Sequence, residues 1–128
     1  MHILLADHRP KIRFALRALL EQWPEFDVIG EAASAEELLA QVGAVRPDLI
    51  LLDWGLRGQD TIMLLRALRG CSAGAAVIVL SSRPEWREAA LDAGADAFVS
   101  KIDPPERLLA TIATVRPINR PDNVQGLP

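Results

Sequence analysis

The sequence predicts an α/β domain with one parallel sheet of five strands and helices on both faces. Short apolar runs and helical patterns alternate five times along the 128 residues. Such alternation requires crossover connections, and these make neighbouring strands parallel. The runs at 48–52 and 76–80 are rich in leucine, isoleucine and valine, as expected for strands covered on both faces. Half of the residues are hydrophobic, which is enough for a core in one domain of this size.

The expected strands are the short apolar runs. In chain order they lie at 3–6, 26–32, 48–52, 76–80 and 97–100. The second run alternates in character, with Phe26 and Val28 set against Asp27 and Glu31. This alternation indicates a strand that is less buried than the others, at an edge of the sheet.

The expected helices have recognisable ends. The first follows Pro10, and the second opens on a capping-box pattern made by Ser34 and Glu37. The other boundaries are Gly70 at the end of the third helix, Pro84 and Gly94 around a short fourth, and 103–106 before the fifth. This pattern stops at about residue 115. Residues 116–128 contain three prolines and little apolar material, so we expect a folded domain at 1–115 and a flexible tail or linker stub.

Composition narrows the classes of function. The net charge of −3 argues against direct nucleic-acid binding by this domain, which usually needs a concentrated basic face. Cys71 is the one cysteine, so the sequence predicts neither a disulfide framework nor a cysteine-rich metal site. The apolar runs are too short to cross a bilayer, and Asp7 comes before a signal-peptide core could form. We therefore expect a cytoplasmic protein with no membrane association.

Polar residues of complementary chemistry follow four of the predicted strands. Asp7 follows the first, Asp53 the third, Ser81 the fourth and Lys101 the fifth. The carboxyl ends of parallel strands share one edge of the sheet, which is where ligands bind in such folds. We therefore expect two carboxylates, a hydroxyl and an ammonium group to meet there.

This combination predicts phosphoryl transfer to a carboxylate. Asp53 would act as the nucleophile and form an aspartyl phosphate. Lys101 and Ser81 would stabilise the charge on the phosphoryl oxygens. Asp7 and Asp53 together would hold a divalent cation such as Mg²⁺.

Four segments carry a family resemblance. They are ILLADHRP at 3–10, PDLILLD at 47–53, VIVLSS at 77–82 and AGADAFVSK at 93–101. They resemble the signature blocks of the receiver domains of two-component response regulators, most closely the subfamily that often carries a C-terminal helix-turn-helix. The resemblance covers about residues 2–115 and implies a flavodoxin-like fold with strand order 2-1-3-4-5.

The resemblance also implies roles for individual residues. Asp53 would accept a phosphoryl group from a sensor histidine kinase, and Ser81 and Lys101 would contact it. Phe98 matches the aromatic switch position, and the backbone carbonyl of Gly55 matches a metal ligand beside Asp7 and Asp53. Mg²⁺ or Mn²⁺ is the expected cofactor. Apart from this self-assisted acceptance we expect no enzymatic activity.

Three positions depart from the family pattern. His8 stands where receivers usually carry a second acid, and imidazole suits Mn²⁺, Zn²⁺ or Ni²⁺ better than Mg²⁺. His8 is therefore a candidate metal ligand, and a weakened Mg²⁺ dependence is expected. Arg57 replaces a usual proline and Thr61 a usual glycine, so the loop after Asp53 could be reshaped. Arg57 could also bring positive charge to the site.

The sequence leaves other functions open. The departures favour a phosphorylation-independent pseudo-receiver that acts as a protein-interaction module. A phosphohydrolase of the same sheet type is disfavoured, because Gly55 stands where a second acid would be needed. The output would be a partner protein or a C-terminal domain beyond residue 128, with transcription control as one outcome, and the resemblance allows a homodimer. Trp86 lies among charged residues and is a candidate aromatic anchor for an interface.

Overall fold

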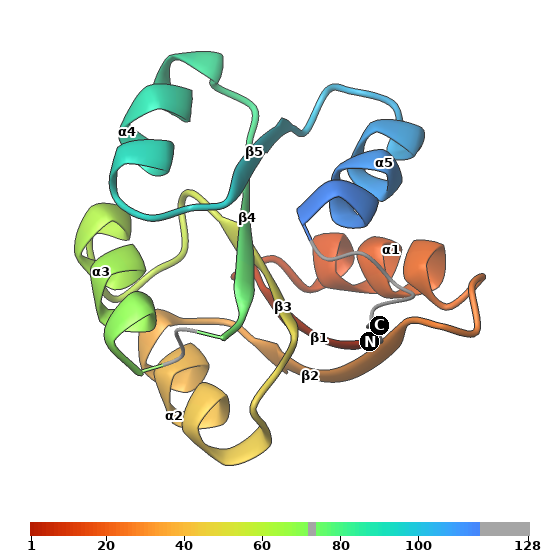
Figure 1. The fold of residues 1–128 in the computed structure, drawn as a ribbon, viewed down its shortest axis with the longest axis horizontal. Coiled ribbons are helices and arrows are strands. Elements are labelled where there is room, and N and C mark those ends of the chain that lie inside the picture. The colour runs from red at the N-terminus through yellow and green to blue at the C-terminus, as the bar shows by residue number, and fades with distance from the viewer. Residues whose placement is uncertain (72–73, 116–128) are drawn as a thin grey trace, which may run out of the picture.

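The structure is a five-stranded parallel sheet with helices on both faces (Figure 1). This computed structural model describes residues 1–71 and 74–115. The strands are β1 (His2–Ala6), β2 (Asp27–Ala32), β3 (Leu49–Asp53), β4 (Ala76–Ser81) and β5 (Ala97–Ser100). The α-helices are α1 (Pro10–Leu20), α2 (Ala35–Val45), α3 (Thr61–Cys71), α4 (Arg87–Asp92) and α5 (Pro105–Val115). The sheet order is β2-β1-β3-β4-β5, so the predicted fold class and strand order are confirmed.

The element boundaries differ from the predictions by small steps. β3 and β4 each extend one residue further than predicted, because Asp53 still pairs with Leu80 and Ser81 with Ser100 in the parallel ladder. Ladder pairing uses backbone groups, so a polar side chain does not end a strand. The predicted fourth helix is divided into a 3₁₀ turn at Pro84–Trp86 and the short α4. The predicted tail at 116–128 lies outside the described residues.

Two hydrophobic clusters hold the helices against the sheet. Ile3 and Leu5 of β1 belong to the cluster that includes residues of α1 and α5, whereas Leu4 and Ala6 belong to the cluster under α2, α3 and α4. Figure 1 shows the same division, with α1 and α5 on one side of the sheet. Successive residues of a strand point to opposite faces, so a strand with helices on both sides is apolar up to its polar carboxyl end. Every residue of β3 and β4 is buried accordingly.

Polar contacts fix the edge strand and the start of α2. Arg13 and Arg17 of α1 each donate an Nε hydrogen bond of 2.8 Å to the Glu31 carboxylate of β2, the predicted edge strand. The Ser34 hydroxyl accepts from the backbone N–H of Glu37 at 3.2 Å, as the capping pattern predicted. In the part of the chain that the structure describes, no helix is long and apolar enough to cross a membrane.

A pair of glycine substitutions tests the backbone geometry. Gly94 has φ +115°, and a Cβ there would lie 2.9 Å from Arg69 Cγ. We expect Gly94→Ala to lower the free energy of unfolding by about 1–3 kcal/mol, measured by urea denaturation. Gly43, inside α2, has open space at the Cβ position, so Gly43→Ala should raise it by roughly 0.5–1 kcal/mol. Equal effects at both positions would contradict this geometry.

Candidate functional site

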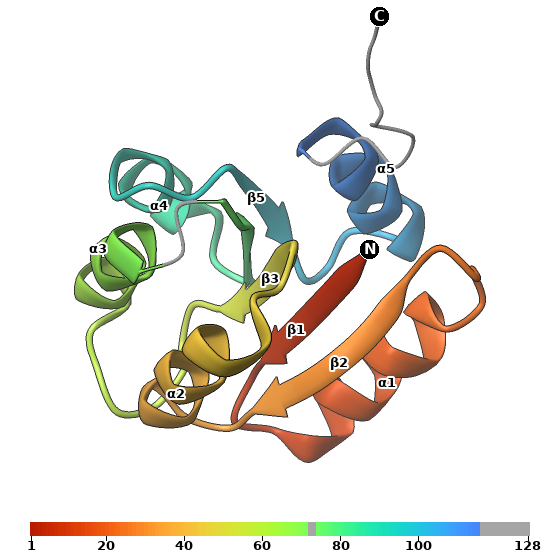
Figure 2. The same ribbon diagram turned by 60° about the horizontal axis from the view of Figure 1, so that its bottom comes forward.

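The site lies at the carboxyl edge of the sheet, where β1, β3 and β5 end. Figure 2 shows the arrowheads of β1 and β2 on the same side of the molecule, as in a parallel sheet. Asp7 follows β1 and is 1% exposed, and Asp53 ends β3 and is 6% exposed. Lys101 follows β5, and its Nζ donates to Asp7 Oδ2 at 3.2 Å and to Asp53 Oδ1. Three of the four residues predicted to meet at this edge are therefore in direct contact.

Arg9 is a further member of the site. Its Nε donates to Asp7 Oδ1 at 3.2 Å, and its Nη2 donates to Asp7 Oδ2 at 3.3 Å and to Asp53 Oδ1 at 3.5 Å. The Arg9 backbone N–H also donates to Asp7 Oδ1 at 2.9 Å. Arg9 is not among the site residues predicted from the sequence. The available signal was its place directly before Pro10, where the chain turns from β1 into α1 beside the strand-end acid.

The two cations control the ionisation of Asp7. Burial by itself would raise the pKa of Asp7, but the hydrogen bonds from Arg9 and the charge of Lys101 outweigh it and lower that pKa. The same contact raises the pKa of Arg9, chiefly through the hydrogen bond to Asp7. Asp7 is therefore a carboxylate at neutral pH, and the site contains a close group of opposite charges.

Metal-binding donors are also present at this edge. Ligand atoms of Asp7, His8 and Asp53 lie within 4.8 Å of one another, close enough to share one ion. His8 Nδ1 is shielded from solvent, has no hydrogen-bond partner in the described structure, and lies 3.9 Å from Asp7 Oδ1. A Cβ on Gly55 would be 3.4 Å from Asp53 Oδ2, so the backbone there passes close to the carboxylate. This donor set suits a cation that accepts both oxygen and imidazole nitrogen.

Ser81 and Phe98 lie on the neighbouring strands. Ser81 is buried at the end of β4, and its hydroxyl accepts from the backbone N–H of Arg83 at 3.0 Å. Phe98 is buried in β5, and the Arg87 guanidinium lies 5.4 Å from its ring centroid. Arg87 also donates to the Phe98 carbonyl at 3.3 Å. Arg87 therefore connects α4 to the predicted switch residue.

The loop after Asp53 is fixed by contacts of its own. Thr61, at the start of α3, donates a hydrogen bond from its hydroxyl to the Trp54 carbonyl. A glycine, which the resemblance leads one to expect at this position, could not form this bond. The Arg57 carbonyl accepts from the Ala35 N–H at 2.7 Å, which ties the loop to the start of α2. The Arg57 side chain is exposed and forms no ion pair with the described residues. The positive charge that Arg57 could have brought to the site comes from Arg9 instead.

Two tryptophans stack beside the site. The rings of Trp54, next to Asp53, and Trp86, in the 3₁₀ turn after β4, have centroids 5.2 Å apart and planes inclined by 14°. Both side chains are partly buried and pack against the core. Trp86 thus stacks on a tryptophan of the same chain. Its predicted role as an anchor for an interface stays a prediction.

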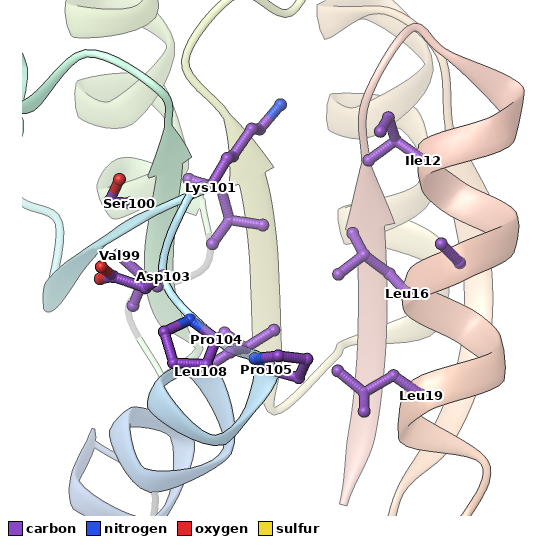
Figure 3. Close-up of a pocket in the computed structure, with 12 residues that line it drawn as sticks. Ile12, Leu16, Leu19, Val99, Ser100, Lys101, Asp103, Pro104, Pro105 and Leu108 are labelled. Atoms are coloured by element: carbon purple, nitrogen blue, oxygen red, sulfur yellow. The ribbon is translucent and has the colours of Figure 1, made fainter.

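An apolar pocket lies next to the site without sharing its chemistry. It has a volume of about 310 Å³ and lies between α1 and the start of α5, with Leu16, Val99 and Leu108 in its walls. Figure 3 shows that the Lys101 side chain, which lines one end, extends away from the apolar residues. Its ammonium group contacts the two carboxylates instead. The reactive groups are therefore outside this pocket.

Comparisons with known proteins agree with this fold. The family described as response regulator receiver domain matches residues 3–113. The nitrate/nitrite response regulator protein NarL of Escherichia coli is 34% identical over 112 residues, which are 86% of this chain and 52% of that protein. The KDP operon transcriptional regulatory protein KdpE of the same species is 41% identical over 102 residues, 78% of this chain and 44% of that protein. The chain spans about half the length of these relatives.

Solved structures show the same architecture. A two-component response regulator of the LuxR family from Aurantimonas superposes with a TM-score of 0.83 at 28% identity, covering 89% of this chain and 83% of that one. RcsB from Salmonella enterica, bound to promoter rprA, gives a TM-score of 0.84 at 25% identity, covering 91% of this chain and 60% of that one.

Replacement of Arg9 tests the electrostatics of the site. In Arg9→Gln the pKa of Asp7 should rise, because burial then acts against a single remaining cation, Lys101. Carboxyl ¹³C NMR titration measures this shift directly.

The lowered pKa of Asp7 also makes the stability of the fold depend on pH. It adds stability that is present above the ordinary pKa of aspartate and is lost as the pH falls through the pKa of Asp7 in the folded protein. Glu31 is the internal control. Burial would raise its pKa, but the hydrogen bonds and charges of Arg17 and Arg13 lower it, and Arg9→Gln should leave that pKa unchanged. An unchanged pKa of Asp7 would refute the assignment of Arg9.

Proposed function

The chain belongs to the response-regulator receiver domain family, and from that membership we propose that Asp53 accepts a phosphoryl group from a sensor histidine kinase. The contact of Asp53 with Lys101 at the carboxyl edge of the sheet is the observation that carries this proposal. Regulation is the purpose of the transfer, and acceptance on its own residue is the only chemistry that we propose for this domain. Receivers of two-component systems work in the cytoplasm, and we propose the same location here.

The residues of the site suit the transfer step. An oxygen of the Asp53 carboxylate attacks phosphorus while the bond from phosphorus to the donor nitrogen breaks, and the electron pair leaves with that nitrogen. The Lys101 ammonium offsets charge on the phosphoryl oxygens. The Ser81 hydroxyl accepts from Arg83, so its own hydrogen can donate to a phosphoryl oxygen.

Receivers in general bind Mg²⁺ at an acidic site, and this chain offers a variant of that site. Asp7, Asp53 and the Gly55 carbonyl would hold Mg²⁺ or Mn²⁺, with His8 as a further ligand. A bound cation would offset negative charge on the phosphoryl oxygens. The imidazole at position 8, in place of an acid, supports a weaker dependence on Mg²⁺.

The output step would be a shift between two packings of the face made by α4, β5 and α5. Phosphorylation adds negative charge at Asp53 and so favours one packing over the other. Phe98 and Arg87 connect this face to the site. These relatives are full-length regulators, so the output would lie in a partner or a C-terminal domain. Transcription control by the parent protein and homodimer formation are further parts of the proposal.

A pseudo-receiver is the second candidate function. It is favoured by His8 and by the occupation of both carboxylates by Arg9, an arrangement that could persist without phosphorylation. The intact Asp53, Ser81 and Lys101 favour the first candidate. The two functions differ in whether Asp53 can be phosphorylated at all.

Loading with a small phosphodonor distinguishes them. We expect phosphoramidate to add one phosphoryl group to the protein in the presence of Mg²⁺ or Mn²⁺, seen by intact-mass spectrometry and removed by hydroxylamine. Asp53→Asn should take up none, and Lys101→Ala should load at least about tenfold more slowly, because a cation is missing from the transition state. Failure of the unmodified protein to load with either cation would leave the pseudo-receiver as the better account.

A further inference from the structure

We propose that Arg9 is a resident cation of the phosphorylation site, which allows Asp53 to accept a phosphoryl group without a metal ion. This inference rests on the proposed function and assigns a positioning and charge-balancing role within it. A divalent ion would bind to Asp7 and Asp53 only by displacing the Arg9 guanidinium.

Arg9 contacts both carboxylates of the site. Its guanidinium lies on both carboxylate oxygens of Asp7 and reaches Asp53 Oδ1 at 3.5 Å. Both oxygens of Asp7 are thus already hydrogen-bonded to Arg9, and a metal shared by the two acids would need one of them. A planar, permanently charged fork suits two carboxylates better than a point charge does. Arg9 and a metal ion therefore compete for the Asp7 carboxylate.

The formal charges at the site sum to zero without a metal ion. The two buried carboxylates of Asp7 and Asp53 contact two cationic side chains, Arg9 and Lys101, so these four groups balance. An acid at position 8 with no cation at position 9 would instead leave an excess of two negative charges, which is the charge that one divalent ion offsets. His8 brings no negative charge to this group. The present residues thus meet the electrostatic need for a metal from within the chain.

The exposure of Arg9 shows how the charge can be used. Its side chain is 45% exposed, whereas those of Asp7 and Asp53 are 2% and 7% exposed. The guanidinium therefore covers the carboxylates from the solvent side and can turn outward. As the bond from phosphorus to Asp53 forms, Arg9 can transfer its hydrogen bonds from Asp53 to the oxygens of the phosphoryl group, where negative charge accumulates.

Two measurements on four proteins test the proposal. The proteins are the unmodified chain, Arg9→Gln, Arg9→Lys and the control Arg66→Gln, which removes the same charge from an exposed position on α3. Loading of Asp53 from phosphoramidate is followed by mass spectrometry in EDTA and in Mg²⁺. The donor's phosphorus–nitrogen bond breaks, a phosphorus–oxygen bond to Asp53 forms, and the nitrogen leaves as ammonia after taking up a proton. Binding of Mn²⁺ is measured separately, from the free-ion signal in electron paramagnetic resonance.

The expected results have opposite directions in the two measurements. The loading rate of the unmodified chain in EDTA should be no more than about tenfold below its rate in Mg²⁺. In EDTA, Arg9→Gln should load at least about tenfold more slowly than the unmodified chain. Arg9→Gln should bind Mn²⁺ at least about tenfold more tightly, because the competing cation is gone. Arg9→Lys should stay close to the unmodified chain in Mn²⁺ affinity, and Arg66→Gln should match it in both measurements.

Either of two results overturns the proposal. One is a loading rate that falls in EDTA, relative to Mg²⁺, by the same factor in the unmodified chain as in Arg9→Gln. The other is an Mn²⁺ affinity that does not rise in Arg9→Gln. In both cases the proposed function stands if Asp53 loads in Mg²⁺. Absence of loading under every condition would instead refute the proposed function, and the metal-free acceptance with it.

Discussion

The structure depends on one electrostatic arrangement, in which two buried carboxylates are held together by two cations. Asp7 and Asp53 are almost inaccessible to solvent, and each would be costly to keep charged without a partner. Lys101 reaches both from β5, and Arg9 reaches both from the start of α1. The four residues come from three strand ends and a helix start. The parallel sheet must therefore form with its strands in this order before the charges can meet.

The fold that brings these charges together follows from the hydrophobic pattern. β3 and β4 are buried on both faces, and the two hydrophobic clusters place α1 and α5 on one side of the sheet and the other helices on the opposite side. The central strands then direct their carboxyl ends to one edge. Polar residues at those ends are close to each other for topological reasons, although they are up to 94 positions apart in the chain.

The amino-acid sequence predicted the elements of the fold, and the family resemblance predicted the strand order. Strand periodicity and helix caps located the elements, and the rule on strand ends brought Asp7, Asp53 and Lys101 together. Arg9 was missed because its role depends on how the chain turns after β1, and a side-chain direction in a turn has no periodic signal. The Trp54–Trp86 stack and the bond from Thr61 to the Trp54 carbonyl were beyond prediction for the same reason, since both join loops.

The sign of one stability change tests the central claim most directly. If the carboxylates are balanced by Arg9 and Lys101, Asp53→Asn should lower the free energy of unfolding by roughly 1–3 kcal/mol, because it removes a hydrogen-bonded partner of both cations. Urea denaturation at neutral pH in the presence of EDTA measures this change. If the two acids instead repel each other without compensation, Asp53→Asn should raise the free energy of unfolding, and that result would contradict the account.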